Sequence, residues 1–139
     1  MAEEHNLRPD DYVGMSFWLI SIALAASSGF FTLERFNVDE KWKTSMTVSA
    51  LVTGIAASHY YYMRNIWVNK GENPITYRYI DWFLTVPLQI IEFYLILSVS
   101  NKVPIELFNK LLAASVLMIL FGFLGETGVI NRMLGFTLG

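Results

Sequence analysis

Two acidic residues lie inside an otherwise apolar stretch that is long enough to cross a membrane, from Tyr79 to Val99. Asp81 and Glu92 are eleven residues apart, so a helix would place them on one face, separated by about three turns or roughly 16 Å. Burying a carboxylate within a membrane-spanning helix is energetically unfavourable, so such residues usually mark a functional site. The pair predicts two stations on a proton path. A soluble buried helix with ion-paired acids is the alternative.

Asp81 has a basic residue close by in the sequence. Arg78 precedes it by three positions, so the two side chains can be neighbours on a helix surface. An adjacent guanidinium favours the ionised carboxylate, which would keep Asp81 available as a counterion or proton acceptor. Thr85, one turn further on, can hydrogen-bond the same group. A structural ion pair at the membrane interface is the other interpretation.

Glu92 and His59 are the other titratable candidates. Glu92 is flanked by isoleucine and aromatic residues, and such surroundings favour the protonated form of a carboxyl group, as a proton donor requires. If Glu92 instead points to a polar cavity near the helix end, it is a solvated anchor. His59 could tune a nearby carboxylate around neutral pH, because histidine titrates there. A plain interfacial histidine explains it equally well.

Composition excludes several classes of protein. The 139 residues are 54% hydrophobic and only 16% charged, whereas soluble domains average about 25% charged residues. A net charge of −2 argues against a nucleic-acid partner. Because the sequence has no cysteine and two histidines, we expect no disulfide, no thiolate nucleophile and no metal site.

Four apolar segments must position these side chains. They have membrane-spanning length and are joined by short polar connections, which predicts an all-α membrane protein with an up-and-down helix bundle in the lipid bilayer. Residues 1–139 are expected to form one domain with helices at about 13–35, 44–64, 78–99 and 105–130. Residues 132–139 look like the entry to a fifth helix. Basic residues divide five against five between the two sides, so charge does not set the orientation.

The segment RYIDWFLTVPLQIIEFYLIL, residues 78–97, resembles the third helix of microbial rhodopsins of the proteorhodopsin group. The similarity extends over most of the chain. It includes SFWL at 16–19, ER at 34–35, KWKTS at 41–45, LVTGIA at 51–56, HYYYMR at 59–64 and FGFLGETG at 121–128. The string Asp-Trp, Thr-Val-Pro, Glu-Phe-Tyr at these spacings is highly specific.

The resemblance implies a retinal-binding, light-driven outward proton pump, which is a transporter and not an enzyme. Asp81 matches the Schiff-base counterion and proton acceptor, Glu92 the cytoplasmic proton donor, and His59 a histidine that bonds the acceptor. The positions that match the retinal-lining residues are Trp82, Thr85, Val86, Met118 and Gly122, and Gln89 matches the tuning position, where glutamine is typical of blue-absorbing members.

The resemblance also implies a place in the cell and a partner. The family topology has the N-terminus outside the bacterial inner membrane, which the chain would cross several times. Trp18 matches a position at the subunit contact of a ring-shaped homo-oligomer, for which His59 is a second candidate.

The family has seven helices, and four are expected here. Its retinal lysine lies on the seventh helix, whereas the five lysines of this sequence lie in loops or at helix ends, so the lysine that binds retinal is not expected among them. Two other functions remain open. One is a light sensor or ion-conducting rhodopsin, and the other is a non-photoactive membrane fragment that needs partner helices.

Overall fold

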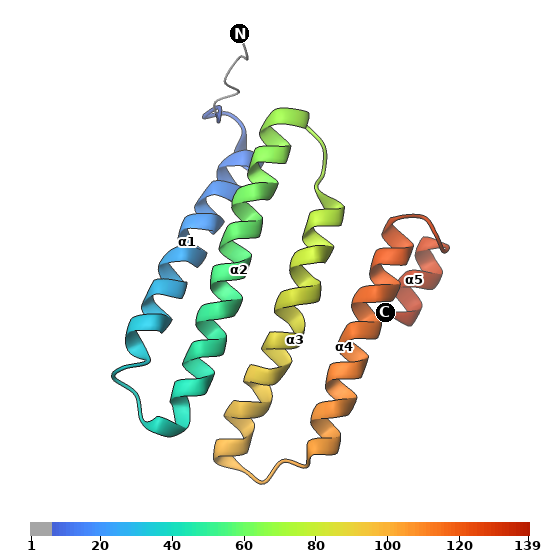
Figure 1. The fold of residues 1–139 in the computed structure, drawn as a ribbon. Coiled ribbons are helices and arrows are strands. Elements are labelled where there is room, and N and C mark those ends of the chain that lie inside the picture. The colour runs from blue at the N-terminus through green and yellow to red at the C-terminus, as the bar shows by residue number, and fades with distance from the viewer. Residues whose placement is uncertain (1–6) are drawn as a thin grey trace.

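The structure is a computed structural model that describes residues 7–139. The described residues form five helices and no strand: α1 (Tyr12–Glu34), α2 (Glu40–Lys70), α3 (Ile75–Ser100), α4 (Ile105–Glu126) and α5 (Arg132–Leu138). The first four run up and down as antiparallel neighbours, and the short α5 folds back against α4 (Figure 1). The predicted all-α up-and-down bundle is confirmed.

Two helices end at different residues from those expected. The second, predicted over 44–64, runs from Glu40 to Lys70 and is capped by Gly71 in the left-handed conformation, with φ 64°. The fourth, predicted to reach residue 130, ends at Glu126. A turn that contains Gly128, with φ 75°, then leads into α5. Glycine favours this conformation because it has no Cβ, and the conformation ends an α-helix. The fifth helix lies where its entry was expected.

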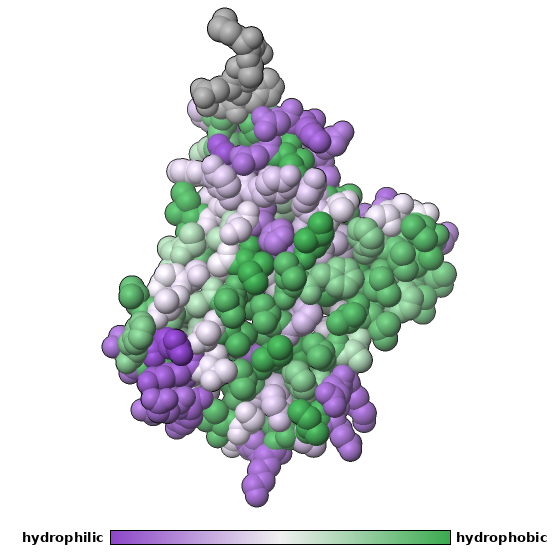
Figure 2. All heavy atoms as spheres, in the orientation of Figure 1, coloured by the Kyte–Doolittle hydropathy of each residue, from purple (hydrophilic) through white to green (hydrophobic). Residues whose placement is uncertain are grey.

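On the face shown in Figure 2, apolar side chains form a belt across the middle of the bundle and polar residues gather at its two ends. By length and composition, three helices of the described part could cross a membrane: α1, α3 and α4. The expected span at 44–63 lies in α2, which is too polar to qualify. The position of α2 explains this difference. Of the five described helices, α2 has the most extensive contacts with its neighbours, α1 and α3, so less of its surface needs to suit lipid.

Small and hydroxylated residues join α1 to α2. Ser21 Oγ donates to the Ala57 carbonyl at 3.0 Å, and Ser28 Oγ donates to the Ala50 carbonyl at 2.8 Å. Side chains this short let the two backbones approach closely, as they do in membrane helix pairs. The contact fixes one face of α2 and leaves the opposite face for α3.

The start of α1 is held to the far end of α2 by one carboxylate. Asp11 caps α1 by accepting from Gly14 N at 2.9 Å, and it also accepts from Trp67 Nε1 at 2.9 Å. An N-cap satisfies a backbone donor that the helix itself leaves free. Asp11 therefore both begins α1 and sets its position along α2.

Candidate functional site

Asp81 is buried at the contact between α3 and α2. Only 3% of the residue is exposed, and its Oδ1 lies 3.6 Å from Nδ1 of His59 on α2. The same imidazole nitrogen lies 3.1 Å from the main-chain carbonyl of Ile55, one turn earlier. A buried carboxylate thus faces a titratable ring across the helix contact, within ion-pair distance when the histidine is protonated.

The predicted local partners of Asp81 are wrong. Arg78 Nη2 donates to Asn73 Oδ1 at 3.3 Å, and Arg78 makes no ion pair with Asp81 in the described part of the chain. The reason is geometric, because helical side chains lean toward the N-terminus, and for Arg78 that is the direction of Asn73. Thr85 Oγ1 donates to the main-chain carbonyl of Asp81 at 2.9 Å, not to its carboxylate.

Glu92 also has a partner on α2. Its Oε1 accepts a hydrogen bond from Ser49 Oγ, and Glu92 itself is half-buried. The apolar flanks of Glu92 along its own helix give no sign of this partner, so Ser49 was not predicted. The spacing of polar residues on the two helices is the signal that could have identified Ser49. Ser49 and His59 are ten residues apart on α2, and Asp81 and Glu92 are eleven apart on the antiparallel α3.

Both acids therefore meet a polar side chain of α2 along a single helix contact. The same register continues toward the connection between the helices, where the rings of Tyr62 and Tyr77 pack edge to face with centroids 5.1 Å apart. At 1.5 Å of rise per residue, the acids lie roughly 16 Å apart along this contact. The arrangement can hold protons at two separated depths in the bundle.

The residues predicted to line a cofactor occupy α3 and α4. On α3, Trp82, Val86 and Gln89 recur at one-turn spacing, and on α4 Met118 and Gly122 do the same. Trp82 is 36% exposed and Met118 45% exposed, so each offers apolar surface outside the contacts within the described chain. Val86 is half-buried, Gln89 is exposed, and Thr85 is buried beside Asp81.

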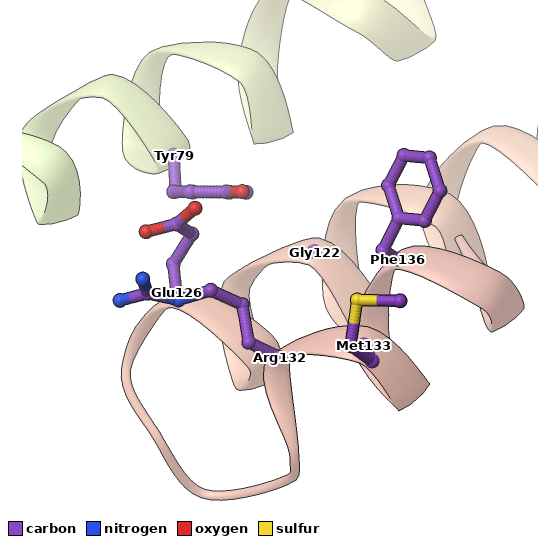
Figure 3. A pocket seen from close by; sticks show the side chains of 7 residues that line it. Tyr79, Gly122, Glu126, Arg132, Met133 and Phe136 are labelled. Carbon is purple, nitrogen blue, oxygen red and sulfur yellow. The ribbon is translucent and has the colours of Figure 1, made fainter.

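A hollow of about 490 Å³ opens between α3, α4 and α5 (Figure 3). Its lining is mostly apolar and consists of Tyr79, Gly122, Gly125, Glu126, Arg132, Met133 and Phe136. Gly122 belongs to the predicted lining set, while Tyr79 and the α5 residues were not predicted. The missing Cβ of Gly122 leaves space that the ring of Tyr79 approaches.

These surfaces suit an apolar polyene such as retinal, but no lysine of the chain is placed beside them to attach it covalently. Lys41 and Lys43 lie in the first turns of α2, Lys70 ends it, Lys102 lies between α3 and α4, and Lys110 lies near the start of α4. None of the five lines the hollow. Residues 7–139 also contain no group of three or more histidine, aspartate or glutamate residues placed to hold a metal ion.

Outside the apolar segments, one charged pair marks the polar end of α2. Lys43 Nζ donates to Glu40 Oε1 at 2.6 Å, and this bond lowers the pKa of Glu40. Both side chains reach the surface, where ion pairs add little stability. The pair therefore belongs to the boundary of the apolar belt and not to the candidate site.

Comparison with known proteins agrees with the fold and with the resemblance noted in the sequence. The profile of the bacteriorhodopsin-like protein family matches residues 11–139. The green-light absorbing proteorhodopsin of Gamma-proteobacterium EBAC31A08 is 53% identical over 96% of this chain and 54% of its own length. The blue-light absorbing proteorhodopsin of Gamma-proteobacterium Hot 75m4 is 52% identical over 96% of this chain and 53% of its own. The chain thus spans about half the length of these curated relatives.

Solved structures give the same result. The crystal structure of the blue light-absorbing proteorhodopsin from Med12 matches with a TM-score of 0.84 and 52% identity, over 93% of this chain and 61% of that one. Xanthorhodopsin, described as a light-driven ion pump with dual chromophore, matches with a TM-score of 0.71 and 34% identity, over 87% of this chain and 54% of that one. The chain belongs to the bacteriorhodopsin-like protein family.

Proposed function

We propose that this chain forms part of a light-driven outward proton pump that uses retinal. The observation that carries the proposal is the pairing of two acids with two polar residues along one helix contact, Asp81 with His59 and Glu92 with Ser49. Relatives named as light-absorbing proteorhodopsins and as a light-driven ion pump support it. Both halves of a proton path, an acceptor and a donor, are present in α3.

Asp81 is the proposed proton acceptor. Its burial removes competing water, and the imidazole of His59 is the titratable group that faces it across the helix contact. Retinal, when bound, supplies light absorption and a group that gives up and takes back a proton on illumination. Asp81 holds the released proton, and His59, which faces it from α2 at 3.6 Å, is the proposed partner of this carboxyl group.

Glu92 is the proposed proton donor at the other depth of the bundle. Ser49 holds its carboxyl group in one orientation, and the flanking apolar side chains limit access of water. A proton given up by Glu92 is then replaced from the polar end of the bundle that lies nearer to it. This order moves protons in one direction along the contact of α2 and α3.

The direction of pumping fixes the proposed orientation. Asp81 lies in the half of α3 that is on the same side as the start of α1, and Glu92 lies toward the opposite end (Figure 1). Outward transport therefore requires an N-terminus outside the bacterial inner membrane. We place the chain there as a protein that crosses the membrane several times.

The proposed wall for retinal is the apolar surface of α3 and α4. Trp82, Val86 and Met118 would hold the polyene, Gly122 would belong to the same wall, and Thr85 would lie beside the acceptor. Gln89 is the proposed colour-tuning residue and favours blue absorption. Identity does not decide the colour, because the green and blue relatives match almost equally well, at 53% and 52%.

A homo-oligomeric ring through α1 and α2 is also proposed. Trp18 is 42% exposed, and it lines a hollow of about 430 Å³ between these helices together with Ala25, Ser58 and Tyr61. The side chain of His59 remains 22% exposed beside Ser58, so a neighbouring copy could reach it. A Trp18→Ala variant should run as a smaller species in mild detergent, and an unchanged size would remove Trp18 from the contact.

Light-driven acidification tests the pump directly. For this test the chain is joined after Gly139 to the part of the green-light absorbing relative that it does not match, which gives a fusion called here the joined protein. The joined protein is expressed in cells supplied with all-trans retinal, and the cells are illuminated in an unbuffered suspension. We expect acidification that Asp81→Asn abolishes and Glu92→Gln slows, while Glu106→Gln, an exposed acid on α4, leaves it unchanged.

Two outcomes overturn the proposal in different ways. A visible absorption band without acidification would refute the pump and favour a light sensor. If the relative itself binds retinal under the same conditions and the joined protein forms no band, the assignment of the retinal wall is wrong. The chain would then fit better as a membrane fragment that needs other partner helices.

A further inference from the structure

An aromatic residue that the proton path does not use connects α3 to α4. Tyr79 lies two positions before Asp81, and its ring packs edge to face against Trp82, with centroids 5.0 Å apart, and against Phe123 of α4, at 5.4 Å. Such pairs prefer a defined angle and separation. The orientation of Trp82, a residue of the proposed retinal wall, is therefore coupled to the position of Tyr79.

The position of Tyr79 in turn depends on a glycine. A Cβ added at Gly122 would lie 3.0 Å from Tyr79 Oη, 3.4 Å from Cε1 and 3.7 Å from Cζ. The hydroxyl contact is closer than ordinary van der Waals packing, whereas the two ring-carbon contacts are ordinary. Figure 3 shows Tyr79 reaching from α3 toward α4 and α5, where Gly122 lies in the α4 ribbon.

We propose that Tyr79 is a positioning residue for the retinal wall and that Gly122 acts on that wall through Tyr79. This inference rests on the proposed function. The space at Gly122 accommodates the phenol group of Tyr79. The phenol ring then sets the orientation of Trp82, whose ring packs against the polyene. The resemblance noted in the sequence assigns Gly122 a direct contact with retinal, so the two assignments make different predictions.

The difference lies in one atom. If Gly122 acts through Tyr79, a methyl group at position 122 disturbs the site mainly by pushing the hydroxyl oxygen, which Tyr79→Phe removes while it keeps both ring contacts. Gly122→Ala should then be nearly silent in the Tyr79→Phe background. If Gly122 contacts retinal directly, the added methyl group disturbs the cofactor equally in both backgrounds.

A double-mutant cycle in the joined protein decides between these cases. The parent, Gly122→Ala, Tyr79→Phe and the double variant are compared by the position of the visible band with retinal and by near-ultraviolet circular dichroism without it. We expect Gly122→Ala to shift the band and to change the aromatic signal in the parent, and most of both effects to disappear in Tyr79→Phe. Gly29→Ala is the matched control, because a Cβ there meets nothing within 4 Å.

Equal shifts in the two backgrounds would overturn the inference. If Gly122→Ala does not fold, Tyr79→Leu takes its place, because it removes the ring that packs on Trp82. An unchanged band and an unchanged aromatic signal in Tyr79→Leu would also overturn it. A parent that forms no visible band at all counts against the proposed function instead, and the circular dichroism without retinal still tests the contact of Tyr79 with Gly122.

Discussion

Replacing Ser49 with alanine removes the hydroxyl that donates to Glu92 across the contact of α2 and α3. When Glu92 gives up a proton, negative charge develops on its carboxyl group, and a fixed donor stabilises that charge. A hydrogen bond contributes about 1 kcal/mol to a neutral acceptor and roughly 1.5–3 kcal/mol to a charged one. The difference, about 1 kcal/mol at the transition state, corresponds to a slowing of proton donation by about five-fold.

Flash photolysis of the joined protein measures this step as the recovery of the visible band. Ser49→Ala should slow the recovery, and Ser49→Thr should restore most of the rate because it keeps a hydroxyl at the same place. Ser27→Ala is the matched control. Its hydroxyl donates to the Ala23 carbonyl of its own helix at 2.8 Å, and that helix, α1, carries neither acid.

Either of two results would refute a role for Ser49 in proton donation. A recovery rate in Ser49→Ala that equals the parent rate would mean that the hydroxyl does not assist donation. An equal slowing by Ser49→Ala in the Glu92→Gln background would mean that Ser49 acts on the cycle by another route. In that background we expect Ser49→Ala to add nothing, because the donor is already absent.

Three further predictions each concern a single residue. Asp11→Ala removes the cap of α1 and the acceptor of an indole on α2, and should lower the free energy of unfolding by about 1–3 kcal/mol. Thermal loss of the visible band measures it, and an unchanged midpoint would contradict it. Gly135→Ala should destabilise by about 1–3 kcal/mol, because its Cβ would lie 2.9 Å from Gly125 Cα, while Gly29→Ala should not. Gln89→Leu should shift the band to the red, and an unshifted spectrum would remove Gln89 from tuning.

The helices could be predicted from the sequence because apolar runs and turn residues are local signals. The start of α1 is within one residue of the expected position, and α5 begins where its entry was expected. The bounds of α2 could not be predicted in this way, since its polar ends stay helical beyond the apolar segment. The end of α4 could not be predicted either. The segment stays apolar beyond Glu126, but a turn with Gly128 in the left-handed conformation ends the helix there.

The candidate site shows where local reasoning stops. Asp81 was expected to pair with Arg78 because the two are three residues apart, yet Arg78 bonds Asn73 and the carboxylate faces α2. Spacing on a single helix allows a contact but does not select it. His59 Nδ1 lies 3.6 Å from the Asp81 carboxylate. Ser49 carried no signal in its own segment and became visible only from its position opposite Glu92.

A short connection makes such partners predictable in principle. Because residues 71–74 join α2 to α3 as antiparallel neighbours, one contact sets the register for the others. His59 meets Asp81, so Ser49, ten residues earlier on α2, meets Glu92, eleven residues later on α3. The rotation of each helix is harder to obtain. On α3 the exposed Phe83, Leu84 and Phe93 are apolar, whereas the two buried residues, Asp81 and Thr85, are polar. Lipid thus removes the contrast that marks the inner face of a soluble helix, and only the rare polar side chains indicate which way the helix turns.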